Sequence, residues 1–182
     1  MNILFTCAGR RYYLLKYFKE AIGNSGNIVA TDMQLSAPAL TAADVKIQVP
    51  KVYATNYIAT ILQICEEQQI GVLISLNDLE LPILSKHKSE FELLGVKVIV
   101  SDPRVVDICF DKYKTAQYIE SLGLNTPKTY IDYNEAVAAI KAGTLNFPLI
   151  LKPRWGSGSI GLEFVDDLEE LSMVYKFDKK KV

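Results

Sequence analysis

Residues 2–100 alternate between short apolar runs and longer segments whose apolar residues recur at helical spacing. The runs predict strands over residues 2–6, 27–31, 46–49, 72–75 and 96–100, separated by helices over residues 11–22, 37–43, 57–69 and 79–87. Neighbouring parallel strands need a crossover between them, so this alternation predicts a doubly wound parallel sheet with right-handed crossovers. Such an α/β, Rossmann-like domain binds its ligands beyond the carboxyl ends of the strands. Those ends are residues 7–11, 31–32 and 76–80.

Two of the predicted helices carry clear apolar stripes. The helix over residues 11–22 is closed by Gly23, and its stripe comprises Leu14, Tyr17, Phe18, Ala21 and Ile22. The helix over residues 57–69 repeats Ile58, Ile61, Leu62 and Cys65. These faces are expected to cover the sheet.

The pattern changes after residue 102. Asp102 followed by Pro103 is typical of a helix start, and we place the domain boundary here, giving domains 1–102 and 103–182. The second domain reads as helix, strand 129–131, helix, strand 149–151, glycine loop, strand 162–165 and helix. Two capping boxes mark its later helices, and Gly143 closes the first of these. The boxes are Asp132 with Glu135, and Asp166 with Glu169.

The residues best suited to binding a phosphate follow the apolar run 149–151. This run predicts a buried strand, and Lys152 comes directly after it. The Gly/Ser-rich segment 156–161 follows at once, and a second strand comes after it. Glycines let a backbone approach phosphate closely, and an ammonium beside them acts as a point charge on the phosphate oxygens. In a P-loop the lysine follows the glycines and a helix comes next. Here the lysine comes first and the loop joins two strands, so this is not a Walker site.

This arrangement resembles the ATP-grasp superfamily, in particular its carbamoyl-phosphate-synthase-like branch. A second motif supports the resemblance: Asp111-Lys112 leads into a helix that ends at Gly123-Leu-Asn-Thr-Pro127. The two motifs stand in the family's order and at about its spacing. The resemblance implies a Rossmann-like pre-ATP-grasp domain followed by the first α+β subdomain of an ATP-grasp fold, with the C-terminal half missing from this chain.

The resemblance also implies roles for individual residues. Lys152 would bind the α/β-phosphates of ATP, and Lys112 would be the first nucleotide-binding cation. Backbone N–H groups of the loop would contact the β/γ-phosphates, and the loop residues concerned are Ser157, Gly158, Ser159 and Gly161. From the residues alone, other interpretations stay open. Lys152 could extend into solvent from a strand end, Lys112 could be an ordinary surface lysine, and the loop could be an exposed hairpin turn.

Substrate contacts are expected from both domains. Arg10 follows the first strand, while Asp78 and Glu80 follow the strand 72–75, so all three belong to the carboxyl edge of the sheet. Asn77 or Asp78 would cap the next helix, and Glu80 would either face the cleft and hold an amine or ammonium or play no part in binding. Arg154 has two alternatives: contact with phosphate or substrate, or an ion pair with a nearby carboxylate.

Composition excludes several classes of protein. The net charge is −1, which argues against nucleic-acid or anionic-membrane binding. The basic run 176–182 is short and is expected to be a solvated tail. No run approaches the ~18–20 apolar residues of a membrane span. The cysteines Cys7, Cys65 and Cys109 are widely spaced in apolar contexts, which predicts reduced core residues of a cytoplasmic protein.

The function predicted is that of the ATP-binding N-terminal portion of a ligase. Such enzymes activate a carboxylate as an acyl phosphate, which an amine or ammonia then attacks. The Mg²⁺ ligands of the family lie in its later half, so no metal ligand is assigned in this chain and no catalytic residue is named. The chain is expected to be either an N-terminal fragment of a ligase of ordinary length or half of a split enzyme that a second polypeptide completes, and to be inactive alone. Exposed strand edges, where the missing half would pair, predict self-association into a possible homo-oligomer. Two alternatives remain: an NAD-dependent oxidoreductase, for which Cys7–Arg11 lacks the full glycine fingerprint, and a non-catalytic nucleotide-binding module.

Overall fold

A computed structural model describes residues 1–178 of the 182-residue chain. The chain forms two compact units that divide between Val106 and Asp107, inside the helix α5 (Pro103–Phe110). Most of the basic run 176–182 lies outside the described residues.

Unit 1 is built on a five-stranded sheet in the order β3-β2-β1-β4-β5, with every neighbouring pair parallel. Its strands are β1 (Asn2–Thr6), β2 (Ile28–Asp32), β3 (Val45–Gln48), β4 (Ile70–Ser75) and β5 (Lys97–Val98). The strand order reverses between β1 and β4, which makes their carboxyl ends the topological switch point of the sheet. The predicted doubly wound sheet is confirmed.

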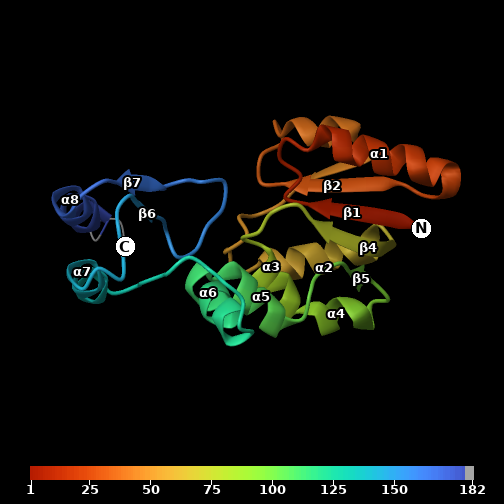
Figure 1. Cartoon of the computed structure of the whole chain (residues 1–182). Helices are drawn as coiled ribbons and strands as arrows, with labels where there is room; N and C mark the ends of the chain where they lie inside the picture. The colour runs from red at the N-terminus through yellow and green to blue at the C-terminus, as the bar shows by residue number, and fades with distance from the viewer. Residues whose placement is uncertain (179–182) are drawn as a thin grey trace. The chain divides into compact units, whose positions relative to one another are not determined.

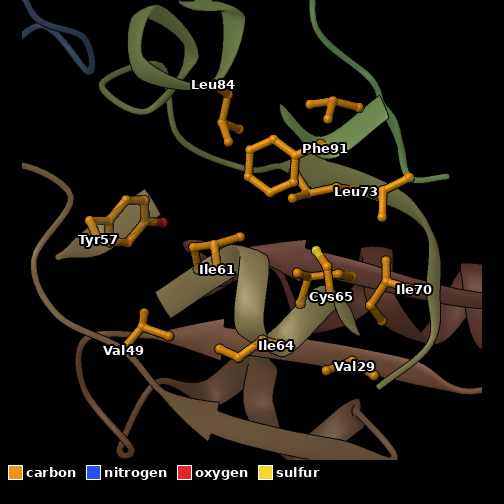
Figure 2. Packing of buried hydrophobic residues seen from close by; sticks show 13 residues of the cluster. Val29, Val49, Tyr57, Ile61, Ile64, Cys65, Ile70, Leu73, Leu84 and Phe91 are labelled. Atoms are coloured by element: carbon orange, nitrogen blue, oxygen red, sulfur yellow. The ribbon is translucent and has the colours of Figure 1, made fainter. Parts of the chain in front are cut away.

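Helices cover both faces of this sheet (Figure 1). The helices of unit 1 before α5 are α1 (Tyr12–Ile22), the 3₁₀ helices η1 (Gly23–Ser25) and η2 (Pro38–Ala42), α2 (Tyr57–Glu67), α3 (Leu81–Lys86) and α4 (Lys88–Leu93). Successive residues of a strand point to opposite faces. Phe5 and Ala30 therefore pack with α1 and η2, whereas Leu4, Val29 and Leu73 pack with α2, α3 and α4. Figure 2 shows this second cluster, in which Phe91 lies beside Leu73 and which also includes Tyr57, Ile61 and Leu84.

The helical stripes differ in detail from the prediction. On α1 the fully buried residue is Leu15, with Phe18 and Ile22 packed beside it, while Tyr17 is 62% exposed and Ala21 is exposed. Positions 15, 18 and 22 follow the three- and four-residue spacing of one helical face, so the predicted stripe was rotated by about one residue. On α2 the buried set is Tyr57, Ile61, Ile64 and Cys65, with Ile58 and Leu62 partly buried.

Element boundaries also differ. The predicted helix 37–43 is the 3₁₀ helix η2, and the predicted helix 79–87 is α3, followed by α4, which was missed. His87 lies between them, and its Nδ1 lies 2.6 Å from Glu90 Oε1. The capping prediction at Asn77 or Asp78 was wrong: α3 begins at Leu81, and Asn77 Oδ1 instead accepts from the Leu79 N–H.

Unit 2 is smaller and carries a two-stranded antiparallel sheet, β6 (Leu149–Leu151) with β7 (Glu163–Val165). Its helices after α5 are α6 (Lys112–Ser121), α7 (Tyr133–Lys141) and α8 (Leu168–Asp178). Residues 129–131 form no strand, which corrects that prediction. The predicted cap at Asp132 is present, because its Oδ1 accepts from the Asn134 and Glu135 N–H groups. The cap of α8 is Asp167 rather than Asp166.

The strand before the glycine loop is less buried than predicted. Ile150 is 50% exposed, and Leu149 and Leu151 are only partly covered, because a two-stranded sheet offers few neighbours. Among the described residues no helix is both long enough and apolar enough to cross a membrane. Cys65 is buried, but Cys109 is exposed, so the prediction that it belongs to the core was wrong.

Candidate nucleotide site

Unit 2 contains an open pocket of about 540 Å³. Four cationic residues line it, and the only acidic residue among its lining is Asp132; the cations are Lys112, Lys128, Lys152 and Arg154. Aromatic rings form much of its remaining wall, including a stacked pair, Tyr133 and Tyr175, whose centroids are 4.8 Å apart. Cations beside aromatic surface fit a ligand that joins phosphate to a flat base.

Lys152 lies just beyond the end of β6, where the sequence places it. Its side chain is exposed and borders the pocket. An exposed ammonium at the mouth of such a pocket is available to an anion.

Lys112, the first residue of α6, occupies the same pocket but is held by the protein. Its Nζ donates to the carbonyl oxygen of Gly156 at 2.9 Å and lies 3.5 Å from that of Arg154. Its backbone N–H also donates to the Arg154 carbonyl, at 3.2 Å. Lys112 therefore fastens the start of the glycine loop to the start of α6.

Arg154 forms an ion pair with Asp111. Its Nε lies 2.9 Å from both carboxylate oxygens of Asp111, and its Nη2 lies 2.6 Å from Oδ2. The guanidinium also stacks at 4.8 Å on the Trp155 ring and at 5.6 Å on Tyr113. Of the two alternatives for Arg154, the structure shows the pair with a nearby carboxylate.

Asp111 is 3% exposed, and it also caps α6 by accepting from the N–H groups of Tyr113 and Lys114. The guanidinium of Arg154, together with these backbone donors, lowers the pKa of the Asp111 carboxyl below its ordinary value. Asp111 is therefore charged whenever the chain is folded near neutral pH.

The glycine loop between β6 and β7 is exposed throughout. Its turns use left-handed backbone at Gly156, Gly158, Ser159 and Gly161. At Gly161, φ is +74°, and a Cβ would lie 3.0 Å from Pro153 Cγ, so only glycine fits there without adjustment. Ser157, the remaining candidate, is exposed in the same loop.

Unit 1 has its own polar cluster at the switch point of the sheet. Glu80 is fully buried and accepts three hydroxyl hydrogen bonds: from Thr6 at the end of β1 (2.7 Å), from Ser75 at the end of β4, and from Tyr57 on α2 (2.6 Å). Burial, followed by the charge of Glu80, raises the pKa of the Tyr57 hydroxyl. Tyr57 therefore remains a donor to Glu80.

The other predicted residues of this edge lie outside that cluster. Arg10 and Asp78 are both exposed. Asp32, at the end of β2, accepts from the N–H groups of Gly9 and Gln34, so both its oxygens hold the chain's own loops. The structure thus brings Lys112, Lys152 and Arg154 to one pocket, whereas Arg10, Asp78 and Glu80 are separate features of unit 1.

Among the described residues there is no group of three or more His, Cys, Asp or Glu side chains arranged to hold a metal ion. Asp132, the one carboxylate of the pocket lining, already accepts from the Asn134 and Glu135 N–H groups, and no residue of the pocket is assigned to Mg²⁺.

Several contributing residues were not identified from the sequence as site residues. Asp111 was read only as part of a motif, and its pairing with Arg154 spans 43 residues. Tyr57, Thr6 and Ser75 were read only as helix or strand residues. No local pattern marks such contacts, although a polar residue at the end of an apolar strand is a usable signal.

Comparison with known families identifies the chain. Residues 3–99, more than half of its length, match the family model described as "PylC-like, N-terminal domain". The chain belongs to the PylC-like family. This places it in the ATP-grasp superfamily and confirms the predicted membership.

Two curated relatives agree with this assignment. An 88-residue segment is 30% identical to the carbamoyl phosphate synthase large chain of Campylobacter jejuni, covering 48% of this chain and 8% of that protein. An 85-residue segment is 38% identical to a D-alanine–D-alanine ligase of Stutzerimonas stutzeri, covering 47% of this chain and 27% of the ligase. The chain thus matches only a small part of the length of each relative. Both relatives are members of the ATP-grasp superfamily.

A solved structure extends the likeness of fold over almost the whole PylC-like chain. The biotin carboxylase domain of the 2-oxoglutarate carboxylase of Hydrogenobacter thermophilus, solved with MgADP and bicarbonate, covers 96% of this chain with a TM-score of 0.68 and 18% identity. The match includes 39% of that chain. The predicted fold, a Rossmann-like domain followed by part of an ATP-grasp domain, is confirmed.

Proposed function

We propose that this chain is the ATP-binding portion of an ATP-dependent carboxylate–amine or carboxylate–ammonia ligase that acts through an acyl phosphate. The observation that carries the proposal is the pocket of unit 2, where Lys112 and Lys152 lie among aromatic side chains. The glycine loop adjoins this pocket, because Lys112 Nζ donates to the carbonyl oxygen of its first residue, Gly156. Membership in the PylC-like family supports the same function.

The pocket lysines and the adjoining glycine loop each have a part in this proposal. Lys152 neutralises phosphate charge from the end of β6, and the exposed N–H groups of Ser157, Gly158, Ser159 and Gly161 donate to phosphate oxygens. Lys112 exchanges its carbonyl partner at Gly156 for phosphate when the nucleotide enters. The nucleotide supplies the phosphoryl group that activates the substrate carboxylate.

Two parts of the reaction are left to other groups. The described residues offer no cluster of metal ligands, so we assign no residue of this chain to Mg²⁺. The chain alone is therefore not expected to turn over, because stabilisation of the transferring phosphoryl group requires charges beyond these lysines. Measurable ADP release by the isolated chain, lost in Lys152→Ala, would contradict this.

The carboxyl edge of the unit 1 sheet is proposed to face the substrate. Arg10 and Asp78 are exposed there, and they can contact a carboxylate and an amine respectively. Glu80 contributes indirectly, because its carboxylate holds the ends of β1 and β4 in place through Thr6 and Ser75.

The test uses Trp155, the only tryptophan of the chain, which is 53% exposed and lines the pocket. Its fluorescence is titrated with Mg-ATP, with NAD as the comparison ligand. We expect saturable binding of ATP but not of NAD, weakened about tenfold or more in Lys152→Ala, the value of one charge-assisted contact.

Lys141→Ala is the matched control, since Lys141 is an exposed lysine of α7 outside the pocket lining. Equal responses to ATP and NAD, or equal losses in the two lysine variants, would overturn the proposal.

A further inference from the structure

Four contacts join the start of α6 to the base of the glycine loop, across 42 to 44 residues of sequence. Asp111 pairs with Arg154 through two guanidinium nitrogens, and the backbone and side chain of Lys112 bond the carbonyls of Arg154 and Gly156. Arg154 lies two residues beyond Lys152 and directly before Trp155. Whatever fixes Arg154 therefore fixes the exit of β6, from which Lys152 projects.

The charges in this junction are internally balanced. Asp111 is 3% exposed, and Arg154 is the only ion-pair partner it has among the described residues. A buried carboxylate needs such a partner, because an unpaired charge removed from water is strongly destabilising. The positive charge of Arg154 is thereby neutralised, which leaves Lys152 and Lys112 as the pocket cations beside the loop.

From this geometry we infer that Asp111 and Arg154 are a positioning pair for the nucleotide site: they hold the base of the glycine loop so that Lys152 and Lys112 address the same ligand. The inference rests on the proposed function. In this arrangement Arg154 acts through its ion pair with Asp111 and through the stack on Trp155.

The experiment separates the ion pair from the helix cap. Asp111→Asn keeps a side-chain oxygen that caps α6, since asparagine caps as well as aspartate does, but it loses the charge that holds Arg154. Arg154→Gln removes the guanidinium. The control is Asp107→Asn, which breaks the more exposed Asp107–Lys114 pair to the same helix without touching the loop.

Two readouts are taken for each variant and for the double variant Asp111→Asn/Arg154→Gln. Calorimetry measures the Kd for Mg-ATP, and acrylamide quenching measures the accessibility of Trp155 in the free chain. We expect each single change to weaken ATP binding about tenfold and to raise quenching, with the double variant no worse than either single. Asp107→Asn should match the unchanged chain, and thermal unfolding checks that every variant remains folded.

The outcomes are distinguishable. Additive losses in the double variant, or single variants that bind ATP and quench like the unchanged chain, overturn the positioning pair. If the unchanged chain does not bind Mg-ATP, the proposed function fails. Acrylamide quenching of Trp155 in the free unchanged chain, the two single variants and the double variant then still decides whether Asp111 and Arg154 together hold the base of the loop. If Asp111→Asn does not fold, Arg154→Lys replaces it, since lysine keeps the charge but not the two-nitrogen contact.

Discussion

The two units of this chain differ in how far they bury their apolar and polar side chains. Unit 1 closes five parallel strands between helices and buries nearly all the fully covered apolar side chains, whereas the buried apolar residues described in unit 2 are Ala116, Val165 and Leu171. Polar groups follow the same division. Glu80 is sealed among hydroxyls in unit 1, while Lys152 and the glycine loop in unit 2 are open to solvent. Unit 1 is organised for packing, whereas unit 2 leaves more of its side chains and its glycine loop accessible to solvent.

The largest effect is expected when a phenylalanine of each unit is replaced by alanine, which tests the difference in burial between the units. Phe91 is fully buried in unit 1, and Phe164 on β7 is 68% exposed. Phe91→Ala should lower the free energy of unfolding of unit 1 by about 3–5 kcal/mol, because it leaves a cavity. Phe164→Ala should change that of unit 2 by less than about 0.5 kcal/mol. Hydrogen exchange resolved by peptide measures the two units separately, and similar losses in both would break the comparison.

The next largest effect is expected in the rates at which a thiol reagent modifies the cysteines of the two units. Burial raises the pKa of the Cys65 thiol in unit 1 to about 12, so at pH 8 only about one molecule in ten thousand carries the reactive thiolate. Burial and the charge of Glu80 also raise the pKa of Cys7. Cys109 in unit 2 is exposed. A thiol reagent should therefore modify Cys109 at least about 100-fold faster than the other two. Mass spectrometry of a time course checks this, and labelling of Cys65 at a comparable rate would contradict it.

Glu80→Gln should be the next most disruptive change. Glutamine keeps the shape but not the two acceptor oxygens, so hydroxyls among Thr6, Ser75 and Tyr57 lose their partners in a buried site. The expected loss is about 2 kcal/mol, measured by chemical unfolding of the chain. Glu92→Gln serves as the control, because Glu92 is exposed on α4 and its change should be nearly neutral. Equal stability of the two variants would mean that the cluster does not stabilise unit 1.

The smallest effect is the acid response of unit 2. The pKa of Asp111 is lowered in the folded chain, chiefly by Arg154, so the stability it contributes is complete above the unfolded-state pKa near 3.8. That contribution is lost as the pH falls through the still lower folded-state value. We expect the unfolding midpoint seen by Trp155 to fall about 2–4 °C more in the unchanged chain than in Asp111→Asn over this window. Identical acid responses would remove the pair as a source of stability.

Much of unit 1 was predictable because its signals are local. Apolar runs and helical spacings predicted each strand of the sheet, and the need for crossovers between parallel strands predicted the layers. Errors arose where the signal is weak. The stripe of α1 was displaced because tyrosines are tolerated at the surface as well as in the core, and residues 129–131 lack the sheet neighbours that a strand requires.

For the site, the sequence by itself determined which groups are available: a lysine at a strand end, a glycine loop after it, and Asp111-Lys112 before a helix. The tertiary structure alone decided their partners. In the folded chain Arg154 pairs with Asp111, and Lys112 donates to the Gly156 carbonyl. Glu80 accepts from three hydroxyls, which belong to β1, β4 and α2. The physical reason is that buried carboxylates such as Asp111 and Glu80 must find partners, and the fold brings Arg154, Thr6 and Tyr57 to them from 23 to 74 positions away along the chain.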